Sequence, residues 1–101
     1  MDVLFDPQFR TDLKRLIRTH PHLHEEIDEL IYAIEDLGGI PPGYNPHPLT
    51  NPRATYTGYW ELHLQEGRFD VLVIYSQHVG KQIIRFIRIG SHQDLFNGPE
   101  L

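Results

Sequence analysis

The sequence predicts an α+β fold in which two N-terminal helices pack on one face of a small antiparallel sheet, with a short helix near the C-terminus. Apolar residues recur with helical spacing up to Leu37 and with a period of two from Tyr59 onward. A chain of 101 residues can bury one modest core and not two, so we expect a single domain over residues 1–101.

The helical part of the sequence contains two helix starts. Residues 2–5 are predicted to form a short strand, and Asp6-Pro7 then supplies an acidic N-cap followed by proline in the first turn. A second start, Thr-His-Pro at 19–21, leads into a longer helix that ends at Gly38-Gly39. The expected apolar faces consist of Phe9, Leu13, Leu16 and Ile17 in the first helix and of Leu23, Ile27, Leu30, Ile31, Ile34 and Leu37 in the second.

The sheet part follows a long proline-rich loop. Residues 40–58 contain five of the eight prolines, and loops of this length inside a compact domain are usually functional. Residues 59–65 alternate, so their apolar side chains face the helices and His63 faces the open side of the sheet. Segments 69–76 and 81–89 complete a three-stranded antiparallel meander, and the first of them is apolar on both faces, as in a central strand.

The composition excludes several classes of protein. There are no cysteines, which removes disulfides, thiolate nucleophiles and cysteine-ligated zinc. No apolar run approaches the roughly 20 residues that span a bilayer, and no secretion signal is recognisable, so we expect a cytoplasmic protein with no membrane contact. The net charge of −5 argues against nucleic-acid binding by bulk electrostatics. That excess lies within residues 1–40, and residues 41–101, with five basic and five acidic residues, can still face an anion.

Three polar residues are expected on the open side of the sheet. His63 lies mid-strand on the polar face, where the alternative is an ordinary solvated histidine. Flanking prolines restrict the backbone of His47 and can aim its side chain, although proline-rich loops also contain histidines without a role. Asp70 begins the central strand across a hairpin from His63, where it either pairs with that histidine or only caps the turn.

The stretch RIGSHQDLF, from Arg88 to Phe96, joins the last strand to the C-terminal helix. Ser91 with an acidic residue three positions later resembles a capping box, which places His92 in the first helical turn. Free N–H groups and the positive dipole end there attract a phosphate, and Arg88 offers a planar charged fork to the same anion. Phe96 either packs under the sheet edge or stacks on a base. The alternative is a strand-end arginine followed by a capped helix without a ligand.

A second histidine cluster lies near the start of the longer helix. His20, His24 and Asp28 recur every four residues and share a helix face, which is a conceivable metal arrangement. Pro21 places the first of them at the helix edge, and nothing else in the sequence completes the site. We therefore expect a solvated face there, and neither a metal nor another cofactor in the protein.

The residues expected on the open side of the sheet suit RNA cleavage without a metal. A base must take the proton from a ribose 2′-OH, a cation must stabilise the phosphorane, and an acid must protonate the leaving 5′-oxygen. Histidines serve as base and acid near neutral pH because their unperturbed pKa is about 6.5. An arginine is suited to the phosphoryl charge.

The sequence resembles the YafQ-type toxins of the RelE/ParE superfamily, the ribonuclease halves of bacterial toxin–antitoxin pairs. The resemblance covers nearly the whole chain, and the order of its elements is also that of the superfamily. It is strongest in His47-Pro48-Leu49, in Gly58-Tyr59, in His63, in Asp70 ahead of VLVIY, and in RFIRIGSHQDLF.

The resemblance implies an mRNA interferase that cuts messages on the translating ribosome. Its partner would be an antitoxin similar to DinJ or RelB, and operator DNA would be bound only through that antitoxin. The resemblance does not assign the base and the acid. The implied site consists of catalytic His47, His63, Asp70 and His92, of Arg88 on the phosphate and of Phe96 in contact with the substrate, and ribosome docking would use Arg53, Arg68, Lys81 and Arg85.

Two other functions fit the same fold. One is a non-catalytic inhibitor, as in the gyrase-poisoning ParE branch, but gyrase binding would require none of the histidines. The other is a degenerate toxin that acts as a protein-binding module, which the acidic net charge favours.

Overall fold

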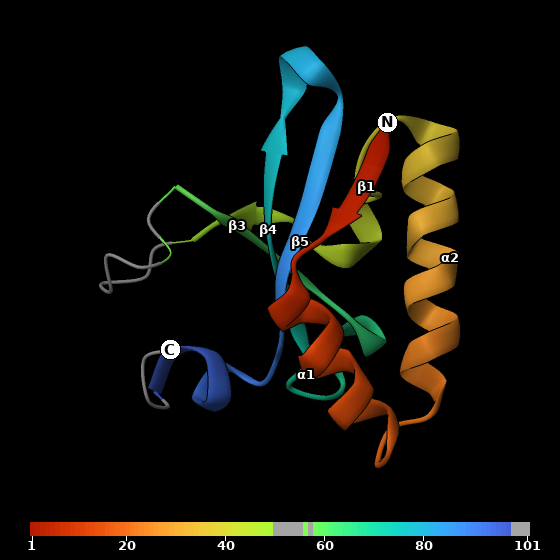
Figure 1. The fold of residues 1–101 in the computed structure, drawn as a ribbon. Coiled ribbons are helices and arrows are strands. Elements are labelled where there is room, and N and C mark those ends of the chain that lie inside the picture. The colour runs from red at the N-terminus through yellow and green to blue at the C-terminus, as the bar shows by residue number, and fades with distance from the viewer. Residues whose placement is uncertain (50–55, 57, 98–101) are drawn as a thin grey trace.

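The computed structural model describes residues 1–49, 56 and 58–97. Within these residues, two helices and five strands form the main elements (Figure 1). In chain order these are β1 (Asp2–Phe5), α1 (Pro7–Ile17), α2 (His22–Leu37), β2 (His47–Pro48), β3 (Trp60–His63), β4 (Leu72–His78) and β5 (Ile83–Gly90). Short helical turns η1 (Pro42–Tyr44), η3 (Gln65–Gly67), η4 (Val79–Lys81) and η5 (Gln93–Asn97) complete the described fold.

The sheet is mixed, with the strand order β1-β5-β4-β3-β2. Strands β3, β4 and β5 form the predicted antiparallel meander. The expectation of a purely antiparallel sheet is wrong at one edge, because β1 pairs with β5 in parallel. Parallel neighbours need a long crossover connection, and here the two helices and the rest of the sheet lie between β1 and β5 in the chain.

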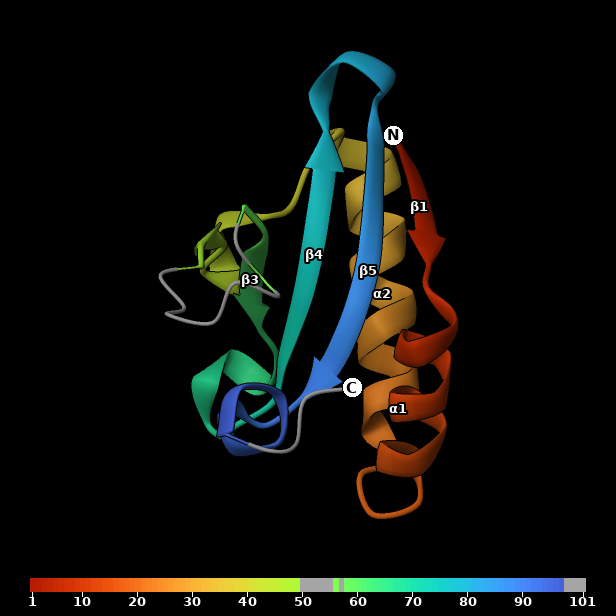
Figure 2. The ribbon, with the colours of Figure 1, turned by 60° about the vertical axis from the view of Figure 1, so that its left-hand side comes forward.

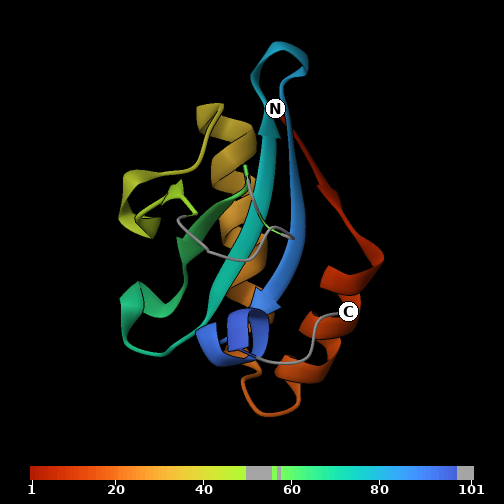
Figure 3. The ribbon, with the colours of Figure 1, turned by 90° about the vertical axis from the view of Figure 1, so that its left-hand side faces the viewer.

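Both helices begin and end close to the predicted positions. Asp6 is the N-cap of α1 and Pro7 is its first residue, where proline loses no helical hydrogen bond. Gly38 ends α2 in the left-handed conformation, with a φ of 79°, and its N–H donates to the carbonyl of Ile34 at 2.8 Å. Helix α2 covers one face of the sheet, and η5 lies on the other (Figures 2 and 3).

Each face of the sheet has its own hydrophobic core, which confirms the prediction that β4 is apolar on both sides. Val73 and Tyr75 of β4 pack toward the helices, whereas Leu72 and Ile74 pack toward η5. The helix-side core also buries Phe9, Leu23, Ile27, Leu30, Ile34, Leu62, Leu64, Val71, Ile84, Phe86 and Ile89. The second core consists of Tyr56, Leu72, Ile74 and Leu95, with Leu49, Tyr59, Ile87 and Phe96 packed against it.

A β-bulge in β5 determines which face Arg88 occupies. Tyr75 pairs with Phe86, but its neighbour Ile74 pairs with Arg88, so Ile87 is an extra residue in β5. In an unbroken strand Arg88 would share the helix-covered face of Phe86, because side chains alternate with a period of two. The bulge shifts this alternation and places Arg88 opposite Ile74, on the face of η5.

Arg68 does not lie with Lys81, so the described residues of the predicted basic patch are not gathered at one place. The turns that carry Arg68 and Lys81 lie before and after β4, at its opposite ends (Figure 2). Arg68 is paired with Glu66 at 3.6 Å, and Arg53 lies outside the described residues.

Within the described part of the chain, no helix is long and apolar enough to cross a bilayer.

Candidate acid–base site

Strand register gathers the predicted polar residues at one end of the sheet. His47 in β2 pairs with Glu61 in β3, and His63 in β3 pairs with Leu72 at the start of β4. Leu72 in turn pairs with Gly90 at the end of β5. The acid–base cluster consists of His47, Glu61, His63, Asp70 and His92.

Glu61 lies at the centre of the acid–base cluster, and the sequence analysis did not identify it as a site residue. It is only 7% exposed, and its Oε1 lies 2.6 Å from His47 Nε2 and 3.8 Å from His63 Nε2. Its Oε2 lies 3.7 Å from His92 Nε2 and is buried without a hydrogen-bond partner. The sequence does contain a signal for Glu61. The alternation in residues 59–65 places this acidic side chain mid-strand on the same face as His63.

His47 is oriented at both ring nitrogens. Its Nδ1 lies 2.9 Å from the carbonyl oxygen of Asn45, which can only accept, so Nδ1 must carry a proton. A second proton is therefore needed in the 2.6 Å contact between Nε2 and Glu61, on either the imidazole or the carboxyl group. The contact between His47 and Glu61 thus contains one proton that the two groups share.

Asp70 pairs with His92 and not with His63. Asp70 Oδ1 lies 2.5 Å from His92 Nδ1, and Asp70 Oδ2 accepts the backbone N–H of His92 at 3.0 Å. The reason is the antiparallel register, because extending the Leu72–Gly90 pairing by two residues brings Asp70 opposite His92. Since the carboxylate accepts from Nδ1, the Nε2 of His92 is left facing Glu61.

The three histidine rings form a continuous row. The rings of His47 and His63 are stacked, with centroids 5.5 Å apart, and those of His63 and His92 are 5.9 Å apart. Phe96 extends the row, 5.7 Å from His92, and its other neighbour is Tyr56 at 5.9 Å. The predicted packing of Phe96 under the sheet is therefore observed, directly beside a histidine of the cluster.

The start of η5 is capped as predicted but is not a free anion site. Ser91 Oγ accepts the N–H of Asp94 at 3.1 Å. The N–H of His92 is bonded to Asp70. Two of the N–H groups expected to attract a phosphate are therefore already used within the protein, and η5 has only five residues. That part of the prediction is wrong.

Arg88 lies outside the acid–base cluster and is paired with Asp12 of α1. Its Nε donates to Asp12 Oδ2 at 2.7 Å and its Nη2 to Asp12 Oδ1 at 3.2 Å, while Nη1 lies 3.4 Å from the Tyr56 hydroxyl. Burial alone would lower the pKa of Arg88, but the hydrogen bonds and charge of Asp12 outweigh it and raise that pKa. Arg88 therefore remains a permanent cation although only 12% of its side chain is exposed.

Three donors of the acid–base cluster are also close enough to share a metal ion. The ligand atoms of His47, Glu61 and His63 all lie within 4.8 Å of one another. By contrast, His24 and Asp28 form a solvent-exposed pair at 3.4 Å, and His20 lies against Phe69. The described residues thus show a solvated helix face in that second histidine cluster, as expected from the sequence.

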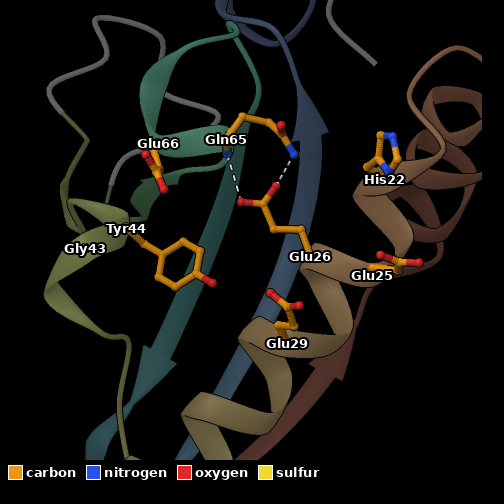
Figure 4. Close-up of a pocket in the computed structure, with 8 residues that line it drawn as sticks. All are labelled: His22, Glu25, Glu26, Glu29, Gly43, Tyr44, Gln65 and Glu66. Atoms are coloured by element: carbon orange, nitrogen blue, oxygen red, sulfur yellow. Dashed lines mark hydrogen bonds between the residues drawn. The ribbon is translucent and has the colours of Figure 1, made fainter.

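A separate pocket of about 440 Å³ lies between α2, η1 and η3 (Figure 4). Glu26 accepts hydrogen bonds from the backbone and side chain of Gln65 there, which ties α2 to the turn before β4. Burial raises the pKa of Tyr44, and the charges of Glu26 and Glu29 raise it further. The four glutamates in its lining make this pocket unfavourable for a phosphate group. The lining residues are His22, Glu25, Glu26, Glu29, Gly43, Tyr44, Gln65 and Glu66.

The fold and the acid–base cluster define a small α+β protein with clustered histidine and carboxylate side chains at one end of its sheet. Comparison with protein families matches residues 1–97 to the bacterial toxin of type II toxin–antitoxin systems, YafQ. The chain belongs to this YafQ toxin family, which confirms the resemblance noted in the sequence.

Solved structures agree with this assignment. The toxin chain of the Escherichia coli DinJ–YafQ complex is 27% identical, with 94% of this chain and 97% of that chain covered and a TM-score of 0.68. YafQ from E. coli strain BL21(DE3) is 25% identical over 94% and 97% of the two chains, with a TM-score of 0.70. A metal-bound toxin from Helicobacter pylori shares the fold, at 24% identity, 95% and 99% coverage and a TM-score of 0.72. A search of curated protein sequences finds no match.

Proposed function

We propose that this toxin is a ribosome-dependent mRNA endoribonuclease, an mRNA interferase, that cuts by acid–base catalysis without a metal. The observation that carries the proposal is the buried carboxylate of Glu61 in contact with three histidines. Acid–base cleavage of RNA needs groups of this kind on both sides of the scissile phosphate, and a protein that only binds a partner has no use for them.

The proposed reaction is a transesterification. A base in the group His47, Glu61 and His63 removes the ribose 2′-OH proton, and the 2′-oxygen attacks the phosphorus. The bond from phosphorus to the 5′-oxygen breaks, leaving a 2′,3′-cyclic phosphate, and the 5′-oxygen takes a proton from an acid. We assign the acid to His92, because Asp70 holds its Nδ1 and leaves Nε2 to exchange the proton.

Two further residues are proposed to contact the substrate. Phe96 lies beside His92 and would support a base or ribose next to the scissile phosphate. Arg88 is proposed to stabilise the phosphorane charge through the part of its guanidinium that Asp12 does not bind.

The proposed partners follow from the family and the reaction. The E. coli relative was solved in complex with DinJ, and we infer that an antitoxin similar to DinJ or RelB neutralises this toxin and alone contacts operator DNA. The substrate would be mRNA on translating ribosomes, which places the protein in the cytoplasm.

The test is to map the 5′ ends of a message in a purified translation reaction. The wild-type protein is expected to produce new ends only while ribosomes translate. His92→Ala is expected to reduce these ends at least tenfold, since general acids contribute about 10²–10⁴-fold. His24→Ala, which removes an exposed histidine far from the site in sequence, is the matched control and should cut as the wild type does. If a folded wild-type protein produces no new 5′ ends, the proposed endoribonuclease activity is refuted. A non-catalytic inhibitor or a protein-binding module would then be favoured.

The donor set of the cluster also predicts metal binding. His47, Glu61 and His63 offer two imidazole nitrogens and a carboxylate oxygen, which are ligands that Zn²⁺ accepts. Isothermal titration of the purified protein with Zn²⁺ is expected to show one site that His47→Ala weakens at least tenfold and His24→Ala leaves intact. Equal Zn²⁺ binding by all three proteins would contradict the prediction. A bound metal would occupy the proposed base, so metal-loaded toxin should be inactive.

A further inference from the structure

Asp12 is a fully buried charged residue that the acid–base cluster does not use. Its carboxylate is 0% exposed and accepts hydrogen bonds from Gln8 Nε2 at 3.1 Å and from the Ile89 N–H at 3.3 Å, in addition to the two from Arg88. Arg15 approaches it at 3.7 Å. Burying a carboxylate is costly, and well-packed apolar residues often replace a buried ion pair without loss of stability. Stability alone therefore does not explain the pair.

Asp12 forms hydrogen bonds with only one edge of the Arg88 guanidinium. An arginine has five N–H donors in a plane, and Asp12 binds the edge formed by Nε and Nη2. Nη1 also donates one N–H to the Tyr56 hydroxyl at 3.4 Å. The second edge, formed by one N–H of Nη1 and one of Nη2, is not bound by Asp12. Two parallel donors of this kind are the arrangement that binds a phosphate through two oxygens.

A chain of contacts links this side of Arg88 to the acid–base cluster. The bulge at Ile87 places Arg88 in a cross-strand row with Ile74 and Glu61, on the face of η5. Tyr56, which contacts Nη1, packs on Phe96, which packs on His92. Thus the bulge in β5 places Arg88 on the sheet face that carries Glu61 and η5. The Asp12 carboxylate restricts the rotation of the Arg88 side chain.

We propose that Asp12 is a positioning residue for the proposed cleavage reaction, holding Arg88 so that its Nη1–Nη2 edge receives a substrate phosphate. This inference rests on the proposed function. Asp12 itself does not touch the substrate, so its effect must pass entirely through Arg88. The opposite role, in which Asp12 withholds Arg88 from RNA, predicts the opposite sign on removal of the charge.

The test combines activity with a measurement that does not need RNA. In the translation reaction, Asp12→Asn is expected to lower the cleavage rate about tenfold. Arg88→Lys keeps a charge beside Asp12 without the second edge, so it should fold and cut at least tenfold more slowly than the wild type. In this Arg88→Lys background Asp12→Asn should alter the rate less than about twofold. A faster Asp12→Asn enzyme, independent effects of the two substitutions, or wild-type cleavage by Arg88→Lys would overturn the proposal.

Hydrogen exchange at Arg88 Nε, followed by ¹⁵N NMR, separates this proposal from the proposed function. The Nε–H is expected to exchange at least tenfold faster in Asp12→Asn than in the wild-type protein. Unchanged exchange would mean that Asp12 does not hold the guanidinium, whatever the activity. If the wild-type protein does not cleave RNA but the exchange difference is present, the proposed nuclease function and the proposed role of Arg88 in phosphate binding are both refuted. The pairing of Asp12 with Arg88 would still be demonstrated.

Discussion

Glu61→Gln is expected to lower the cleavage rate on the order of 10³-fold, because the carboxylate contacts all three histidines of the cluster. Glutamine has nearly the same shape but neither carries the charge nor exchanges the proton held with His47. The variant should show far fewer message 5′ ends in a translation reaction at matched protein concentration.

The same substitution should hardly change stability. Glu61 Oε2 is buried without a partner, and a neutral amide is easier to bury than a carboxylate, so the free energy of unfolding should change by less than about 1 kcal/mol. Urea unfolding measures this. Glu66→Gln, at an exposed position in η3, is the matched control and should alter neither quantity. If the Glu61→Gln protein cuts at the wild-type rate, Glu61 has no role in cleavage and is only structural.

Arg88→Ala is expected to destabilise the protein by about 3–5 kcal/mol, a large share of the about 5–15 kcal/mol that holds a domain folded. The reason is that Asp12, which is 0% exposed, would lose its two strongest donors and keep its charge. Equilibrium unfolding in urea gives the difference from the midpoint and slope.

Arg85→Ala is the control for the effect of removing an arginine from the same strand. Arg85 pairs with Asp6 at 3.2 Å, but both side chains are partly exposed, so its loss should be worth less than about 1 kcal/mol. Asp12→Leu combined with Arg88→Met should recover much of the stability lost in Arg88→Ala, because no buried charge is left unpaired. If Arg88→Ala and Arg85→Ala were equally mild, the buried pair would not behave as the structure implies.

Most of the fold followed from local patterns. Helical spacing and the signals Asp6-Pro7 and Gly38 located both helices, because capping and periodicity act within a few residues. The change to a period of two located the meander and placed His63 on the face opposite the helices. The parallel pairing of the edge strand β1 could not be predicted from such local signals, because β1 and β5 lie near opposite ends of the chain.

The site was predicted in part, for a related reason. His47, His63, Asp70 and His92 are brought together, but Glu61 was missed because its importance arises from burial among side chains of three other segments. Asp70 contacts His92, which neither of its two predicted roles included, because this contact depends on the register between β4 and β5 and not on the hairpin that joins β3 to β4.

The sequence by itself determined the elements, the family and the chemical types available at the sheet end, since each depends on residue identity and short-range spacing. Only the tertiary structure decided which of these groups touch. A one-residue bulge at Ile87 moves Arg88 to the other face, and Asp12, 76 residues away in the chain, binds it there. Register shifts and buried ion pairs depend on the packing of whole elements, and no local pattern encodes them.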